Sequence, residues 1–174
     1  MEENLARRLR MIEDRQQIEE LRATYCFLVD DGRFDELVDS CFTEDASCDF
    51  RAVRGGGALA SVSKGRDEVR KFFSRIVPTI LHDMCHMIHN HRIAIDADRA
   101  SGDCYFEVTG KSPATGEAII GAGRYIDRYR RVDNRWRFEQ RNAEIFYMAP
   151  LADGWVKRPF IDTPAVIQGS NLRG

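Results

Sequence analysis

The spacing of apolar residues changes once along this 174-residue chain, and that change limits the possible folds more than any other feature. Through about residue 80, apolar side chains recur every three or four positions, as on one face of a helix. From about Met84 onward they recur at every second position, as on one face of a β-strand. Helices followed by a run of antiparallel strands are typical of the α+β class. We therefore expect N-terminal helices packed on a curved, mostly antiparallel sheet, a cone-shaped α+β barrel that encloses a pocket.

Three helices are predicted in the first half of the chain. The first helix ends at Gly32. Its apolar stripe is predicted to begin at Leu5 and consists of Leu5, Leu9, Ile12, Ile18, Leu21, Tyr25 and Leu28. A second, short helix places the apolar residues of 34–41 on one face. The third covers 69–80, where Pro78 kinks or ends it because proline lacks the backbone N–H that a helix needs.

The strand predictions begin with residues 48–53 and continue with four long segments at 84–96, 100–111, 117–130 and 134–148. The glycines at 55–57 are predicted to form a loop, and they lack the lysine of a phosphate-binding P-loop. We expect residues 1–150 to form a single domain and residues 151–174, which hold two of the chain's five prolines, to form a tail.

The composition excludes several classes of function. The chain has 26 Lys and Arg against 28 Asp and Glu and no basic block, so nucleic acid is not an expected partner. No signal peptide and no run of 18 apolar residues is present, which predicts a cytoplasmic protein without a membrane partner. The five cysteines are widely spaced and form no CxxC pair, so we expect reduced, mostly buried thiols.

All four histidines of the chain lie in one stretch, LHDMCHMIHNHRI, at residues 81–93. Strand alternation divides them, because His86 shares a face with Asn90 while His89 and His91 share the other face. A His-x-His pair can begin a metal site, but no further histidine remains to complete it, so no metal is expected. His86 lies among apolar residues and Asn90, the mixture typical of a pocket lining, although a hydrogen-bonded core histidine fits equally well.

Asp30 breaks a local rule of helix chemistry. It ends the first helix, where the helix dipole is negative and a carboxylate is disfavoured. Either turn formation with Gly32 or a functional role explains it, since positions that break a local rule are often functional. Tyr25 stands five residues earlier and could border the same cavity, or it could be a core tyrosine on the apolar stripe.

Arg141 lies in the last predicted strand, where the apolar residues change face. Trp136 and Phe138 share one parity, whereas Ala143 and Ile145 share the other. A β-bulge near 139–142 would produce this switch, because an extra residue in one strand reverses the alternation. Arg141 would then point inward.

These segments resemble a known family. IEDRQQIEELRATYCFLVDDGRFDELVDSCFTEDA, then MCHMIHNHRI, then WRFEQRNAEIFY and APLADGW are similar to the SnoaL-like branch of the nuclear transport factor 2-like (cystatin-like) superfamily, over residues 10–155. Within it the chain resembles the lyases scytalone dehydratase, lindane dehydrochlorinase and bile-acid 7α-dehydratase. The resemblance implies the α+β fold expected above, but the superfamily hosts many activities.

The resemblance assigns roles to individual residues. It implies that Asp30 and His86 form the catalytic dyad, that Tyr25 matches a tyrosine of the bile-acid enzyme, and that Arg141 matches a late-strand arginine of the dehydrochlorinase. The chain departs from the dehydrochlorinase at Tyr25, where that enzyme has a lysine. The other substrate-binding tyrosines of these enzymes have no secure match, and the positions that could replace them are Phe50 or Asp49, and Tyr105 or Tyr125.

The resemblance also implies an activity and an assembly. A lyase of this group removes water or halide from a small hydrophobic, cyclic substrate and uses neither a metal nor an organic cofactor. An isomerase or cyclase, a ligand-binding protein and a structural subunit like the small subunit of ring-hydroxylating dioxygenases are the alternatives. The group forms homotrimers, in which a tail such as 151–174 covers the pocket or a neighbouring subunit.

Overall fold

All helical elements that the structure describes lie before residue 81 and the four long strands follow them, which confirms the expected α+β class. The computed structural model describes residues 2–53 and 60–154. Its helical elements are α1 (Glu2–Asp30), α2 (Phe34–Cys41), α3 (Arg66–Lys71), the π-helical turn η1 (Phe72–Ile76) and α4 (Val77–Ile80). Its strands are β1 (Phe42–Ala52), β2 (Ala60–Lys64), β3 (His82–Asp96), β4 (Arg99–Lys111), β5 (Ala118–Val132) and β6 (Arg135–Pro150). Strands β1 and β2 lie between α2 and α3.

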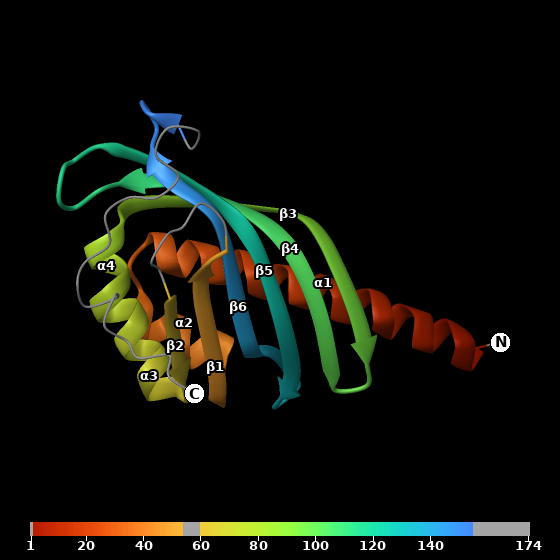
Figure 1. Ribbon diagram of the computed structural model, residues 1–174. Coiled ribbons are helices and arrows are strands. Elements are labelled where there is room, and N and C mark those ends of the chain that lie inside the picture. The colour runs from red at the N-terminus through yellow and green to blue at the C-terminus, as the bar shows by residue number, and fades with distance from the viewer. Residues whose placement is uncertain (1, 54–59, 155–174) are drawn as a thin grey trace.

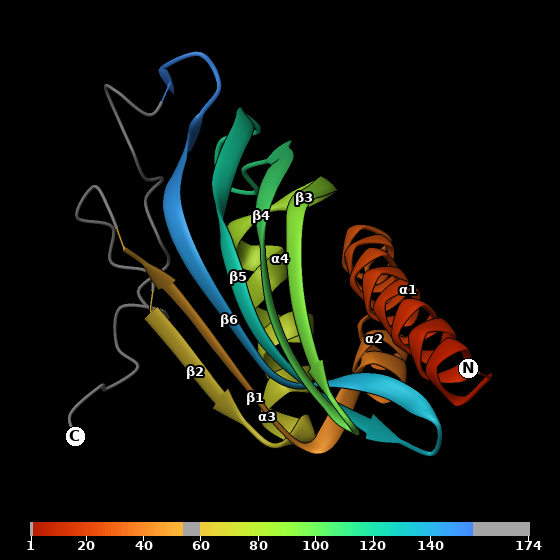
Figure 2. The ribbon, with the colours of Figure 1, turned by 90° about the vertical axis from the view of Figure 1, so that its right-hand side faces the viewer.

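The strands form one curved sheet in the order β2-β1-β6-β5-β4-β3 within the described residues (Figures 1 and 2). Among the described strands, only the pairing of β1 with β6 is parallel. The two edge strands do not pair with each other, so the curved sheet is open rather than a closed barrel. The sequence predicted the four long strands and missed β2, because Ala60–Lys64 is short and holds only two apolar residues. The predicted loop at 55–57 and most of the predicted tail lie outside the described residues.

Helix α1 covers the free edge of β3, along which it runs in Figure 2. Four polar contacts join them. Arg15 Nη2 donates to the Ile93 carbonyl over 3.0 Å and Arg22 Nη1 to His91 Nδ1 over 2.7 Å. The other two join His86 to Asp30, from the backbone N–H to Oδ2 over 2.8 Å and from Nδ1 to Oδ1 over 2.5 Å. An edge strand exposes unpaired backbone groups, and a covering helix satisfies some of them. The dyad candidate Asp30 is therefore also a structural contact.

The predicted apolar stripe of α1 is wrong in its first part. Leu5, Leu9 and Ile12 are 57%, 51% and 62% exposed, whereas the later residues Ile18, Leu21 and Tyr25 are buried. At 3.6 residues per turn the two sets point in directions that differ by roughly half a turn. The first turns of α1 extend beyond the ends of the strands in Figure 1, so they have no sheet beneath them.

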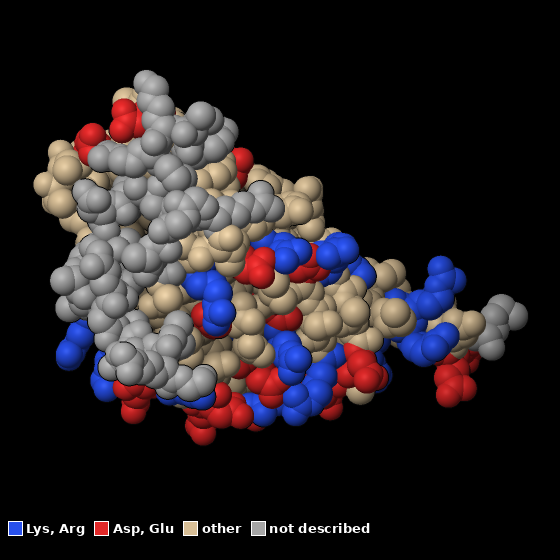
Figure 3. Space-filling model, in the orientation of Figure 1, with Lys and Arg blue, Asp and Glu red and all other residues tan. Residues whose placement is uncertain are grey.

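Charged side chains of both signs are interspersed on the face of the molecule that Figure 3 shows. Ion pairs join charged side chains of neighbouring elements, such as Arg70 of α3 with Asp35 and Asp39 of α2. No helix in the described ranges is long and apolar enough to cross a membrane.

Strand β6 contains the bulge that its sequence predicts. Its pairing with β5 shifts between Phe138 and Gln140, which leaves Glu139 as the extra residue. Phe138 is buried before the bulge, and Arg141, Ala143 and Ile145 are buried after it. The bulge therefore turns Arg141 into the core, as the change of face along the strand indicated.

Gly123 of β5 leaves room for an aromatic stack on the concave face of the sheet. The Phe106 ring stacks on Tyr125 with centroids 4.3 Å apart. A Cβ at Gly123 would lie 2.6 Å from that ring and 2.3 Å from the Glu144 carbonyl oxygen, which is too close for a real contact. The glycine thus sets the position of two rings.

We expect Gly123→Ala to destabilise the protein by about 1–3 kcal/mol, the usual cost of forcing an extra methyl into a packed core. Urea unfolding followed by circular dichroism measures the difference. The matched control is Ala122→Ser, at the half-buried neighbouring position, which should unfold like the wild type. Equal stability of all three proteins would contradict this account of the stack.

Candidate active site

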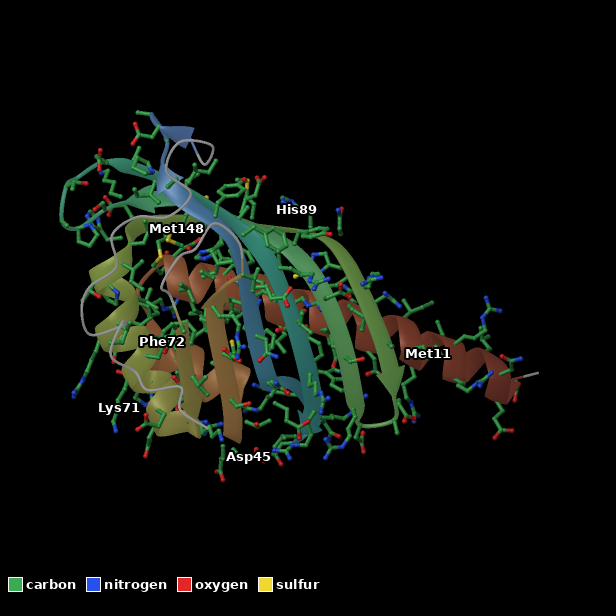
Figure 4. All side chains as sticks on the ribbon, viewed as in Figure 1. Met11, Asp45, Lys71, Phe72, His89 and Met148 are labelled. Carbon is green, nitrogen blue, oxygen red and sulfur yellow. The ribbon has the colours of Figure 1, made fainter. Side chains whose placement is uncertain are left out.

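A mainly apolar cavity of about 80 Å³ lies between the helices and the concave face of the sheet. In Figure 4, Phe72 and Met148 mark the end of the molecule where it is found. The π-helical turn places the adjacent residues Phe72 and Phe73 both on its wall. Three lining residues carry polar groups, His86, Tyr25 and Tyr125, and the rest are Val29, Phe50, Phe72, Phe73, Val77, Ile80, Leu81, Met84, Phe106, Val108, Ile145 and Met148.

The structure brings His86 and Asp30 together at this cavity. His86 Nδ1 lies 2.5 Å from Asp30 Oδ1, and the His86 backbone N–H donates to Asp30 Oδ2 over 2.8 Å. Their side chains are only 8% and 16% exposed. A carboxylate at Nδ1 holds the ring proton on that nitrogen and leaves Nε2 as the basic atom. Because His86 lines the cavity, Nε2 is the nitrogen available to a bound molecule.

The same geometry explains why a carboxylate can end helix α1. The helix dipole disfavours a negative charge there, but two N–H groups of one residue compensate the Asp30 oxygens. Asp31 is exposed and has no such contact with His86. Gly32 follows with a φ of 68°, which a glycine adopts without strain at a helix end.

Arg141 lies fully buried between two tyrosine rings. Its guanidinium carbon is 3.8 Å from the Tyr25 ring centroid and 3.7 Å from that of Tyr125. Both tyrosines line the cavity, whereas Arg141 lies behind them and does not. Burial raises the pKa of both phenols, and the Arg141 cation acts in the opposite direction and lowers them. The inward direction predicted for Arg141 is confirmed, and its contact with the cavity is indirect.

Two further charged residues, Arg22 and Asp127, are buried behind this wall, and neither was predicted from the sequence. Asp127 Oδ2 accepts from the Tyr129 hydroxyl over 2.8 Å, and that hydroxyl accepts from Arg22 Nε over 2.5 Å. Asp127 also forms ion pairs with Arg22 at 3.8 Å and with Arg141 at 3.9 Å. The sequence did hold a sign of the buried carboxylate, because Asp127 alternates along β5 with the same period as Tyr125 and Tyr129 and so faces inward with them.

Of the predicted substrate-binding residues, Phe50 and Tyr125 line the cavity, and Asn90 and Tyr105 do not. Asn90 was expected to share the face of His86, and that prediction is wrong. The pairing of β3 with β4 shifts between His89 and Arg92, and Asn90 has a φ of 57°, so a bulge ends the alternation. Asn90 is exposed as a result.

Tyr105 is 45% exposed on the outer face of β4, where its ring contacts Phe146. Its neighbours Cys104 and Phe106 are buried, so Tyr105 has the outward parity. The alternative position Asp49 is half-buried and pairs with Arg51.

The remaining histidines do not form a common site, and the same bulge separates His89 from His91, which the alternation had placed on one face. His82 and His89 are exposed, and His91 contacts helix α1 through Arg22. Four cysteines are buried and Cys85 is exposed, all as free thiols. In the described parts of the chain, no three side chains of His, Cys, Asp or Glu are grouped as metal ligands would be.

A family model described as a SnoaL-like domain matches residues 10–142. The chain belongs to the SnoaL-like family. Three uncharacterized proteins from Mycobacterium tuberculosis and Mycobacterium bovis are 31% identical to this SnoaL-like chain over 90 residues, 52% of its length. The match covers 56% of those proteins, so the chain spans about half the length of the curated relatives that it matches.

Solved structures share the fold over most of the SnoaL-like chain. Hexachlorocyclohexane dehydrochlorinase LinA-type3 from Novosphingobium barchaimii is 23% identical with a TM-score of 0.71, covering 90% of this chain and 99% of that one. A putative scytalone dehydratase from Novosphingobium aromaticivorans is 19% identical with a TM-score of 0.68, covering 80% and 88%. An NTF2-like protein with a cystatin-like fold from the same organism is 25% identical with a TM-score of 0.59, covering 89% and 93%.

The contact between His91 and Arg22 predicts a pH dependence of stability. Burial lowers the pKa of His91, and the Arg22 cation lowers it further. An unfolded histidine has a pKa of about 6.5, so as the pH falls below that value the unfolded chain gains a proton that the folded chain resists. The free energy of unfolding therefore decreases as the pH is lowered through about 6.5.

We expect His91→Gln to remove this contribution, so that stability falls less between about pH 7.5 and about pH 5.5 than in the wild type. Urea unfolding at both pH values measures it. His89→Gln, at an exposed histidine of the same strand, controls for the loss of an imidazole. An equal loss of stability in wild type and His91→Gln would contradict the assignment.

Proposed function

We propose that this protein is a cofactor-independent lyase that eliminates water or halide from a small hydrophobic, cyclic substrate. The observation that carries the proposal is the His86–Asp30 pair, joined over 2.5 Å at the wall of an apolar cavity. A base is most useful where little water competes for the proton, and the cavity offers few other polar groups. The resemblance to dehydratases and a dehydrochlorinase supports elimination as the reaction.

In the proposed reaction, His86 Nε2 takes a proton from a carbon beside an activating group. The electron pair of that C–H bond forms a double bond to the neighbouring carbon, and the leaving group departs with its own bonding pair. If the leaving group is hydroxide, the imidazolium returns the proton and water is released. If it is halide, the proton passes to solvent. Asp30 holds the ring and stabilises the imidazolium between the two steps.

Tyr25 and Tyr125 are the hydrogen-bond donors that the proposal assigns to the substrate. Negative charge develops on the activating group as the proton leaves, and a phenol donates more strongly when a cation lies against its ring. Arg141 touches both rings and so acts through them. Phe50 and the other apolar residues of the wall would contact the substrate ring.

The cavity also supports an isomerase or cyclase as a second candidate. A cavity wall with few polar groups would keep the abstracted proton on His86, which can return it to another carbon of the same molecule. Product mass separates the two reactions, because elimination loses a fragment and isomerisation does not.

We propose in addition that the protein is a homotrimer. The exposed apolar side chains of Met87, Tyr105 and Ile126 support self-association. Light scattering, which measures the molar mass in solution, tests this proposal.

The test of the dyad uses His86→Gln, Asp30→Asn and the matched control Asp31→Asn. Turnover should fall by roughly a hundredfold to ten-thousandfold in the first two variants, because each removes a part of the general base. Asp31→Asn should keep full turnover, since its carboxylate is exposed and adjacent in sequence only. Screening starts with cyclic β-hydroxy ketones and halogenated cyclohexanes, followed by mass spectrometry. Full activity of His86→Gln or Asp30→Asn would contradict the proposal.

A further inference from the structure

The buried Arg141 is held without hydrogen bonds. Its Nε, Nη1 and Nη2 atoms have no hydrogen-bond partner among the described residues, and its side chain is fully buried. Buried donors are almost always paired, so an arginine with three unpaired nitrogens needs a physical explanation. The stacking on Tyr25 and Tyr125 fixes the plane of the guanidinium but leaves it free to slide and rotate within that plane.

Asp127 is the carboxylate that limits this freedom. Its Oδ1 lies 3.9 Å from Arg141 Nε, and this oxygen has no hydrogen bond of its own. Burial raises the pKa of Asp127, while the nearby Arg141 and Arg22 cations oppose that rise and favour the carboxylate. In the low-polarity interior a charge pair at this distance is strongly attractive. The attraction draws the guanidinium toward β5, where the Tyr125 ring lies.

Asp127 is in turn fixed by its other oxygen. The Tyr129 hydroxyl donates to Oδ2, and Arg22 Nε donates to that hydroxyl. Arg22 itself is anchored at the edge of the sheet by His91. Gly102 leaves the space that Arg22 occupies, since a Cβ there would lie 2.6 Å from Arg22 Nη2. The chain of contacts therefore runs from β3 through α1 and β5 to the wall of the cavity.

We propose that Asp127 is a positioning residue for the proposed reaction: it sets Arg141 between Tyr25 and Tyr125 and thereby tunes the two phenols that face the substrate. Arg22 and Tyr129 hold the carboxylate in place. Two guanidinium groups share this one carboxylate, so the cluster keeps an excess positive charge beside the cavity. That excess favours negative charge developing on the substrate, on the side of the phenols. Only the kinetic part of the test rests on the proposed function.

The first measurement needs no substrate. The Arg141 guanidinium gives an Nε–Hε signal in ¹⁵N-edited NMR, assigned by its loss in Arg141→Lys, and the exchange of its Nη hydrogens reports rotation. Asp127→Asn should shift this signal and speed the rotation. Tyr129→Phe removes one hydroxyl and should do the same to a smaller extent, which keeps the test valid if Asp127→Asn folds poorly. Asp103→Asn is the control, because that carboxylate pairs with the exposed Arg92.

The second measurement is turnover of a substrate found in the screen. Asp127→Asn should lower kcat by roughly a hundredfold with little change in KM. A displaced Arg141 would no longer support the Tyr25 and Tyr125 hydroxyls, and their misplacement affects the transition state more than substrate binding. Asp103→Asn should keep both values. An unchanged Arg141 signal in both Asp127→Asn and Tyr129→Phe would overturn the inference, as would unchanged kcat in a folded Asp127→Asn protein. If the wild type turns over no substrate, the proposed function fails, and the NMR result alone decides on Asp127.

Discussion

The bidentate contact between Asp30 and His86 is the interaction on which the rest of the site depends. One carboxylate oxygen faces the imidazole and the other accepts the backbone N–H of the same residue. This contact ties the end of α1 to the free edge of β3, which closes one side of the cavity. It also orients the ring so that Nε2 is the nitrogen left without a carboxylate partner. The contact that we propose for catalysis is thus also a structural contact, which explains a carboxylate at an unfavourable helix end.

The opposite wall follows a different physical principle. Arg141 is turned inward by a single bulge at Glu139 and then held by aromatic faces and a carboxylate rather than by hydrogen bonds. A guanidinium tolerates this better than an ammonium would, because it is planar and weakly hydrated. The cavity therefore has a base supported by negative charge on one side and phenols supported by positive charge on the other. In the elimination that we propose, such a polarised, apolar space would favour moving an electron pair across the substrate.

The sequence predicted what depends on local periodicity and failed where backbone geometry interrupts it. The long strands and the bulge in β6 could be predicted because apolar residues alternate and then change face. Asn90 could not be placed, since the bulge in β3 rests on a positive φ that has no apolar signature. Asp127 had a signal, a charge on the inner parity of β5, but its partners Arg22 and Arg141 are distant in sequence. The family resemblance supplied the dyad, and the fold supplied its geometry.

The position of the ring proton on His86 tests the account most directly. The ¹⁵N chemical shifts of the imidazole at neutral pH, assigned by their absence in His86→Gln, report which nitrogen carries the proton. The account predicts a proton on Nδ1, facing Asp30, and an unprotonated Nε2 facing the cavity. A neutral ring with its proton on Nε2 would contradict it, because the nitrogen at the cavity would then have no lone pair with which to act as a base.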